Sequence, residues 1–130
     1  MSTYAFGKTV SLDAAQAVTR VTEALAAAGF GVLSDIDVAA TLKKKLGVEI
    51  PPYRILGACN PQFASQAIAI EPQIGALLPC NVVVRQDHDG AVHVEFMDPN
   101  AVLRLAHHPQ IEVIAAEVRA RLLQVMHALP

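Results

Sequence analysis

The stretch 80–97, CNVVVRQDHDGAVHVEFM, places the strongest constraint on how this chain can fold. Apolar and polar residues alternate around DHDG, a pattern typical of two strands joined by a tight turn. The run 82–84 is apolar at every position, which indicates a strand that is covered on both faces. The stretch therefore predicts an antiparallel hairpin whose first strand lies in the middle of a sheet.

The rest of the chain alternates between strand and helix patterns without a linker, so we expect a single domain over residues 1–130. Strands are predicted over 3–10, 30–38 and 53–59. Long helices are predicted after an N-cap at Ser11, from Asn60-Pro61 to about residue 71, and from about residue 109 to the end. Shorter helices are expected over 38–46 and after Asp98-Pro99. This order predicts an α+β fold, with a mostly antiparallel curved sheet and helices packed on one face.

The charge and hydropathy of the chain limit the classes of partner and the cellular locations to be expected. A net charge of −2 and a pI near 6.2 argue against nucleic-acid binding, which uses a basic surface. No apolar run approaches ~18 residues, so no membrane span is expected, and the first residues lack the apolar segment of a signal peptide. We expect a cytoplasmic protein with free thiols. Because helices would cover one face of the sheet, we expect a second copy, in a homodimer, to cover the other.

Both cysteines of the chain are followed by asparagine, in ILGACNPQ (55–62) and LLPCNVVV (77–84). Cys59 closes one predicted strand and Cys80 opens the next. If these strands are antiparallel neighbours, the cysteines meet at one end of the sheet, whereas parallel strands would separate them by ~20 Å at ~3.3 Å per residue. The antiparallel arrangement is favoured because the next pair of strands forms a hairpin. Asn60 also fits a helix N-cap, with Pro61 in the first turn.

The sequence does not decide which groups surround the two thiols. An even loop around DHDG would place Cys80 on one face with His93 and Glu95, as expected for a thiol kept reactive by an imidazole. A buried, inert Cys80 is one alternative. A metal site formed by both cysteines and His93 is another, without the short C-x-x-C spacing of zinc sites. A redox-switched disulfide between Cys59 and Cys80 is a third.

The blocks GFGVLSDIDVAATLKKKLGVEIPPYRILGACNP, IEPQIGALLPCNVVV and MDP resemble the bacterial family known as domain of unknown function 302, most densely over 30–99. The resemblance implies a soluble bacterial domain of TBP-like α+β fold that is compatible with a homodimer, and it implies no activity. The family pattern falls on the following positions of this chain: Asp37, Lys45, Tyr53, Gly57, Cys59, Asn60, Pro61, Glu71, Gly75, Pro79, Cys80, Asn81 and Asp98.

From these observations we expect a small-ligand-binding or regulatory module with a site near the two Cys-Asn steps. A carboxylate at a helix C-terminus, as at Glu71, is electrostatically unfavourable and therefore indicates a role. Two alternatives stay open: a thiol-based redox or metal-binding protein, and a purely structural homodimer. The sequence names no cofactor, metal or catalytic residue, and it leaves open whether the protein is an enzyme. The expected ligand-binding residues are Cys59, Asn60, Cys80, Asn81, Tyr53, Lys45 and Glu71.

Overall fold

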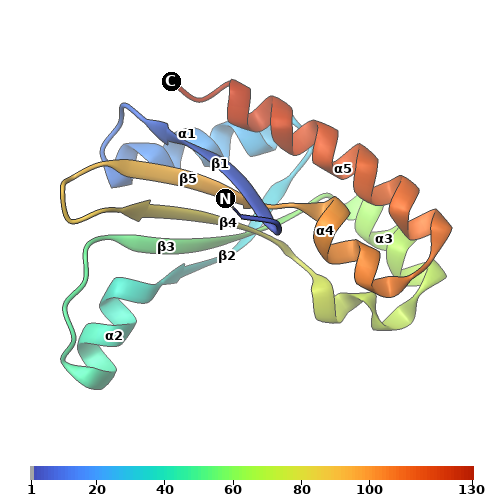
Figure 1. Ribbon diagram of the computed structural model, residues 1–130, viewed down its shortest axis with the longest axis horizontal. Coiled ribbons are helices and arrows are strands. Elements are labelled where there is room, and N and C mark those ends of the chain that lie inside the picture. The colour runs from blue at the N-terminus through green and yellow to red at the C-terminus, as the bar shows by residue number, and fades with distance from the viewer. Residues whose placement is uncertain (1) are drawn as a thin grey trace.

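A computed structural model describes residues 2–130 of the chain. Five antiparallel strands form one sheet in the order β1-β5-β4-β3-β2 (Figure 1). This arrangement confirms the predicted α+β architecture. In chain order the elements are β1 (Ala5–Val10), α1 (Ala14–Ala27), β2 (Gly31–Asp37), α2 (Val38–Leu46), β3 (Tyr53–Cys59), α3 (Pro61–Ile70), the 3-10 helix η1 (Pro72–Leu77), β4 (Cys80–Gln86), β5 (Val92–Met97), α4 (Pro99–Leu103), the 3-10 turn η2 (Arg104–Ala106) and α5 (Pro109–His127).

The hairpin is confirmed, and β4 is the central strand of the sheet, but the predicted even loop is wrong. Val82 pairs with Phe96 and Val84 pairs with Val94, so the five residues 87–91 connect the strands. Gly90 adopts a positive φ of 94° and donates its N–H to the Asp87 carbonyl at 3.0 Å. This left-handed position adds one residue to the turn and shifts the pairing by one position. Every side chain of β5 therefore faces the side opposite to the one predicted.

As a consequence, Cys80, His93 and Glu95 do not form a cluster. The side chains of His93 and Glu95 lie on the sheet face opposite Cys80, because β4 and β5 alternate in step. There Arg85 Nε donates to Glu95 at 2.6 Å, and His93 Nε2 lies 2.6 Å from Asp87 Oδ2. These groups form a surface network with one another, on the face of the sheet opposite Cys80.

The predicted helix boundaries are confirmed except at the start of α1. Asn60 caps α3 by accepting the Phe63 N–H at 3.2 Å, and Asp98 caps α4 in the same way. The cap of α1 is Asp13 rather than Ser11. Asp13 accepts the Gln16 N–H at 2.8 Å while the Gln16 side chain accepts the Asp13 N–H. This reciprocal capping box satisfies two helix-end donors, which a serine two residues earlier is too far away to do.

The hydrophobic core lies between the sheet and the layer formed by α1 and α5, which α3 and α4 extend beyond the end of the sheet (Figure 1). The last helix, α5, turns one apolar face to the sheet, on which Ile111, Ala115, Val118, Leu122 and Val125 are buried. Phe96 of β5 stacks on Phe6 of β1 with ring centroids 5.6 Å apart. The fully buried side chains that make up this core include Phe96, Leu25, Leu56, Ile111, Leu122, Val82, Val84 and Val94.

The opposite face of the sheet is more polar and less covered. Ile55 and Val83 are half-buried there, and Ile36 on the edge strand β2 is 50% exposed. That a second copy covers this face stays a prediction.

Within residues 2–130, none of the helices combines the length and the apolar character needed to cross a bilayer.

Candidate functional site

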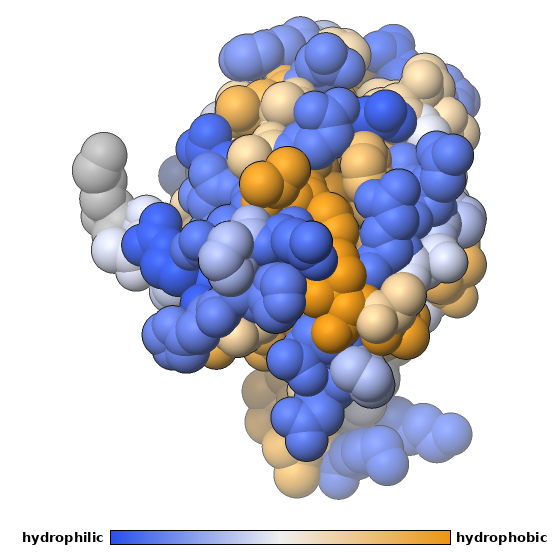
Figure 2. Space-filling model, turned by 90° about the vertical axis from the view of Figure 1, so that its right-hand side faces the viewer, coloured by the Kyte–Doolittle hydropathy of each residue, from blue (hydrophilic) through white to orange (hydrophobic). Residues whose placement is uncertain are grey.

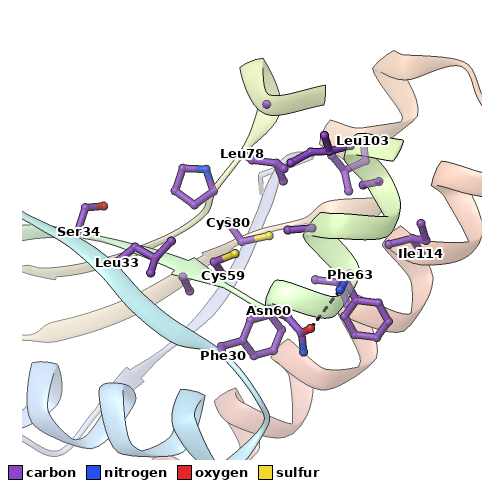
Figure 3. A pocket seen from close by; sticks show the side chains of 17 residues that line it. Phe30, Leu33, Ser34, Cys59, Asn60, Phe63, Leu78, Cys80, Leu103 and Ile114 are labelled. Carbon is purple, nitrogen blue, oxygen red and sulfur yellow. Dashed lines mark hydrogen bonds between the residues drawn. The ribbon is translucent and has the colours of Figure 1, made fainter. Parts of the chain in front are cut away.

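The two cysteines meet, as the antiparallel arrangement of their strands predicted. Cys80 at the start of β4 lies directly opposite Ala58, the residue before Cys59 at the end of β3. Residues of adjacent strands are separated by only ~4.8 Å in the hydrogen-bonding direction. Figure 3 shows both cysteine side chains at the wall of the same cavity. The two cysteines are therefore brought together by strand pairing, although they are 21 positions apart in the chain.

The cavity lies at the end of the sheet, between the ends of β2, β3 and β4 and the helices α3, α4 and α5. Its volume is about 400 Å³. On the end of the molecule that α3, α4 and α5 form, apolar surface runs as a strip between hydrophilic side chains (Figure 2). The residues that line the cavity are Phe30, Leu33, Ser34, Ala58, Cys59, Asn60, Phe63, Ala64, Ala67, Ile68, Gly75, Leu78, Pro79, Cys80, Leu103, Ile114 and Val118.

Asn60 is the buried polar residue of this wall, with 8% of its surface exposed. Its Oδ1 is occupied by the Phe63 N–H, so the side chain fixes the direction in which α3 leaves the sheet (Figure 3). The Phe63 ring, positioned in this way, has the Arg121 guanidinium 5.0 Å from its centroid. Arg121 also donates to the Ala28 carbonyl at 3.4 Å, which links α5 to the end of α1. A cap and a cation–π contact thus hold one aromatic wall of the cavity.

The Cys80 thiol is protonated at neutral pH. Only 6% of the residue is exposed, and burial raises the pKa of its thiol from an ordinary value of 9.0 to about 12, with a further contribution from the charge of Cys59. A reactive thiolate needs a cation, an imidazole or a helix N-terminus to lower its pKa. Within residues 2–130, no three His, Cys, Asp or Glu side chains are grouped so that they could hold a metal ion. The Cys80 thiol is therefore a neutral part of an apolar wall.

The raised pKa of Cys80 predicts a loss of stability at alkaline pH. Above about pH 9 the thiol ionises in the unfolded chain, while in the folded protein it stays protonated until about pH 12. The free energy of unfolding should therefore fall across this interval, by at most about 1.4 kcal/mol per pH unit from this group. Urea unfolding of the wild type and of Cys80→Ala between pH 8 and 11 measures the effect, because all other titrating groups are shared. Equal slopes for the two proteins would contradict it.

The structure does not bring the other four predicted site residues to the cavity. Asn81 is exposed on the opposite face of β4, because neighbouring strand residues point to opposite sides. Tyr53 lies at the other end of β3, where it borders a separate hollow beside α2. Lys45 is exposed on α2, a helix that buries none of its residues. Glu71 is half-buried beside Leu77 and Leu105, in a further hollow.

Most of the cavity wall was not predicted from the sequence. Phe30, Phe63, Leu103, Ile114 and Val118 occupy apolar positions next to helix and strand ends, where the pattern of a core residue and that of a wall residue are the same. The signal that did exist was the proximity of Phe30 and Phe63 to Gly29 and Asn60, which mark the points where the chain turns. Only the packing of α3 away from the sheet distinguishes the wall from the core.

Comparisons with known proteins place these features in a family. A crystal structure of an uncharacterized conserved DUF302 protein from Bacillus stearothermophilus matches with a TM-score of 0.92 and 28% sequence identity, over 99% of this chain and 100% of that one. No curated protein matches this chain. The model of the family described as domain of unknown function DUF302 matches residues 6–129. The chain thus belongs to the DUF302 family.

Proposed function

We propose that this protein is a binding module that takes a compact, largely apolar small molecule into the cavity beside Cys59 and Cys80. The observation that carries the proposal is the cavity itself. Its volume of about 400 Å³ lies within the range of roughly 300–1,000 Å³ that small-molecule sites occupy. Two aromatic rings and a set of aliphatic side chains form its walls, and a few polar groups, among them Asn60 and Ser34, border it.

The walls of the cavity favour an apolar occupant over a charged one. No cavity-lining residue within the described range 2–130 carries a formal charge. Burial of an unpaired charge in such a place costs several kcal/mol, whereas apolar area gains roughly 25 cal/mol per Å². The alternative function, a redox or nucleophilic thiol, finds less support at Cys80, because its thiol stays protonated at neutral pH.

A cavity-filling substitution tests the proposal with naphthalene as the probe. Ala64 lines the cavity from α3, and Ala64→Phe is expected to weaken naphthalene binding by roughly tenfold or more, which is about 1.4 kcal/mol. Ala69→Phe is the matched control, because Ala69 is exposed on the same helix and does not line the cavity. Binding is measured as the rise in the unfolding temperature with naphthalene concentration.

The wild type and Ala69→Phe should show the same rise, and Ala64→Phe a much smaller one. If the wild type shows no rise at saturating naphthalene, the cavity does not bind apolar molecules. Equal rises in all three proteins would place the naphthalene elsewhere and would equally overturn the proposal.

A further inference from the structure

We infer that the cavity is a site for monosubstituted trivalent organoarsenic compounds, which Cys59 and Cys80 bind together through one arsenic atom. The inference rests on the proposed function, since it names the chemical class of ligand for the same cavity. Three features carry it: two neighbouring thiols on one wall, an uncharged lining, and space for an apolar substituent.

The first feature is the placement of the two sulfurs. Strand pairing sets Cys80 opposite Ala58, so the backbone of Cys59 is its diagonal neighbour. In a continuous strand the side chain of Cys59 would point to the other face of the sheet. Here β3 ends at Cys59 and the chain turns at Asn60 into α3, and both cysteine side chains border the cavity (Figure 3). The fold therefore presents two free thiols to one occupant.

The second feature is the uncharged lining, which disfavours any occupant that forms a charged complex with the two thiolates. Thiolate sulfur prefers soft ions. Zinc bound by two thiolates would need further ligands, and within residues 2–130 no third His, Cys, Asp or Glu joins the pair. A monovalent copper ion between two thiolates would leave a net negative charge in an apolar cavity, which is costly. An arsenic(III) atom that carries one carbon substituent takes two thiolates and is then neutral.

The binding reaction balances without a further reagent. The arsenic of R–As=O forms two As–S bonds, one to each cysteine. The As=O bond is lost, the oxygen takes the two thiol protons, and one water molecule leaves. No electron is transferred, because arsenic stays trivalent and both sulfurs stay at the thiol level. A buried thiol that resists ionisation is compatible with this product, since the bound state contains no thiolate charge.

The third feature is room for the substituent R. Phe30, Phe63, Leu78, Leu103 and Ile114 all border the cavity that the two sulfurs face (Figure 3). An apolar cavity of roughly 150 Å³ holds benzene in another protein. A cavity of about 400 Å³ has space for a phenyl group and a dithiol-bound arsenic atom. The apolar walls should therefore favour a phenyl-substituted arsenical over inorganic arsenite, which has no apolar group and a third valence to fill.

Phenylarsine oxide, with inorganic arsenite as the comparison, tests this inference. Native mass spectrometry of the reduced protein in excess glutathione should show one phenylarsenic group bound per chain with loss of one water. A dithiol such as dimercaptopropanol should remove it. Cys59→Ala and Cys80→Ala should each lose the adduct in glutathione, because a single thiol holds arsenic no better than glutathione does. Their urea midpoints verify that both variants are folded.

The substituent is tested with the same pair of helix variants. Ala64→Phe should weaken phenylarsine oxide binding by roughly tenfold relative to Ala69→Phe. If naphthalene binds but no glutathione-resistant adduct forms, this inference fails and the proposed function stands. If neither binds, both fail. An adduct that survives in either single-cysteine variant, or that arsenite forms as tightly as phenylarsine oxide, also overturns the inference.

Discussion

Replacement of Phe96 by alanine should lower the free energy of unfolding by about 3–5 kcal/mol. Phe96 is fully buried at the middle of the covered face of the sheet, where it pairs with Phe6 on one side and with Val82 on the other. Its ring stacks on Phe6, and the Arg119 guanidinium lies 5.2 Å from the centroid of that second ring. Truncation would remove apolar burial, an aromatic pair and the support of a cation–π contact together.

Urea unfolding followed by circular dichroism measures this loss through the midpoint of the transition. Val113→Ala is the control, because Val113 is 72% exposed on α5 and its truncation should change the unfolding free energy by less than about 0.5 kcal/mol. Phe96→Leu should fall between the two, since leucine keeps most of the apolar volume. A loss for Phe96→Ala no larger than that of the control would show that this part of the core is not tightly packed.

Replacement of Gly57 by alanine should cost about 1–3 kcal/mol although it adds a single methyl group. A Cβ at this position would lie 2.3 Å from the Ser34 Oγ and 2.8 Å from the Pro79 ring. Both distances are shorter than a carbon can tolerate, so the Ser34 hydroxyl would have to rotate away and the Pro79 ring would have to shift. Because Ser34 and Pro79 both line the cavity, the same change should weaken naphthalene binding.

Two variants separate this steric effect from a general effect of alanine in strands. Gly31→Ala places its methyl group in open space at the start of β2 and should leave stability within about 0.5 kcal/mol of the wild type. The double variant Gly57→Ala with Ser34→Gly removes the closest contact and should recover part of the loss, with the Pro79 contact remaining. Additive losses in the double variant would show that Ser34 is not what excludes the methyl group.

The strands, the helices and their caps were largely predictable because the signals for them are local. Asn60-Pro61 and Asp98-Pro99 start helices wherever they occur before an apolar pattern, and Gly29 and Gly47 adopt the positive φ that their places at helix ends require. The exceptions are also local. The pattern did not distinguish Ser11 from Asp13 as the cap of α1, since both residue types cap helices and only one aligns with Gln16.

The register between β4 and β5 depends on the backbone conformation of one residue, Gly90, which the sequence pattern did not predict. The residues DHDG predict a turn in either case. A loop with an even number of residues and one with an odd number place the side chains of β5 on opposite faces of the sheet. The positive φ of Gly90 selects the odd loop. It thereby separates His93 and Glu95 from Cys80, and with them the predicted reactive thiol.

Three of the seven residues that the sequence suggested for a site line one cavity. Cys59, Asn60 and Cys80 come together because β3 and β4 are antiparallel neighbours, the arrangement that the sequence favoured without deciding it. Asn81, Tyr53, Lys45 and Glu71 lie elsewhere, because matching a family pattern does not specify which face or which end of an element a residue occupies. No local signal separated the aromatic and aliphatic wall residues from the core.

By itself the sequence determined the elements, their order and the central position of the 82–84 strand, because alternation, capping and helix-ending glycines act over a few neighbouring residues. Only the tertiary structure decided that a cavity exists and which residues face it. Two thiols 21 positions apart share one wall because β3 and β4 pair in one particular register, and the cavity remains because α3 leaves the sheet at Asn60. Register and packing depend on contacts between distant segments of the chain, and a short stretch of sequence does not specify such contacts.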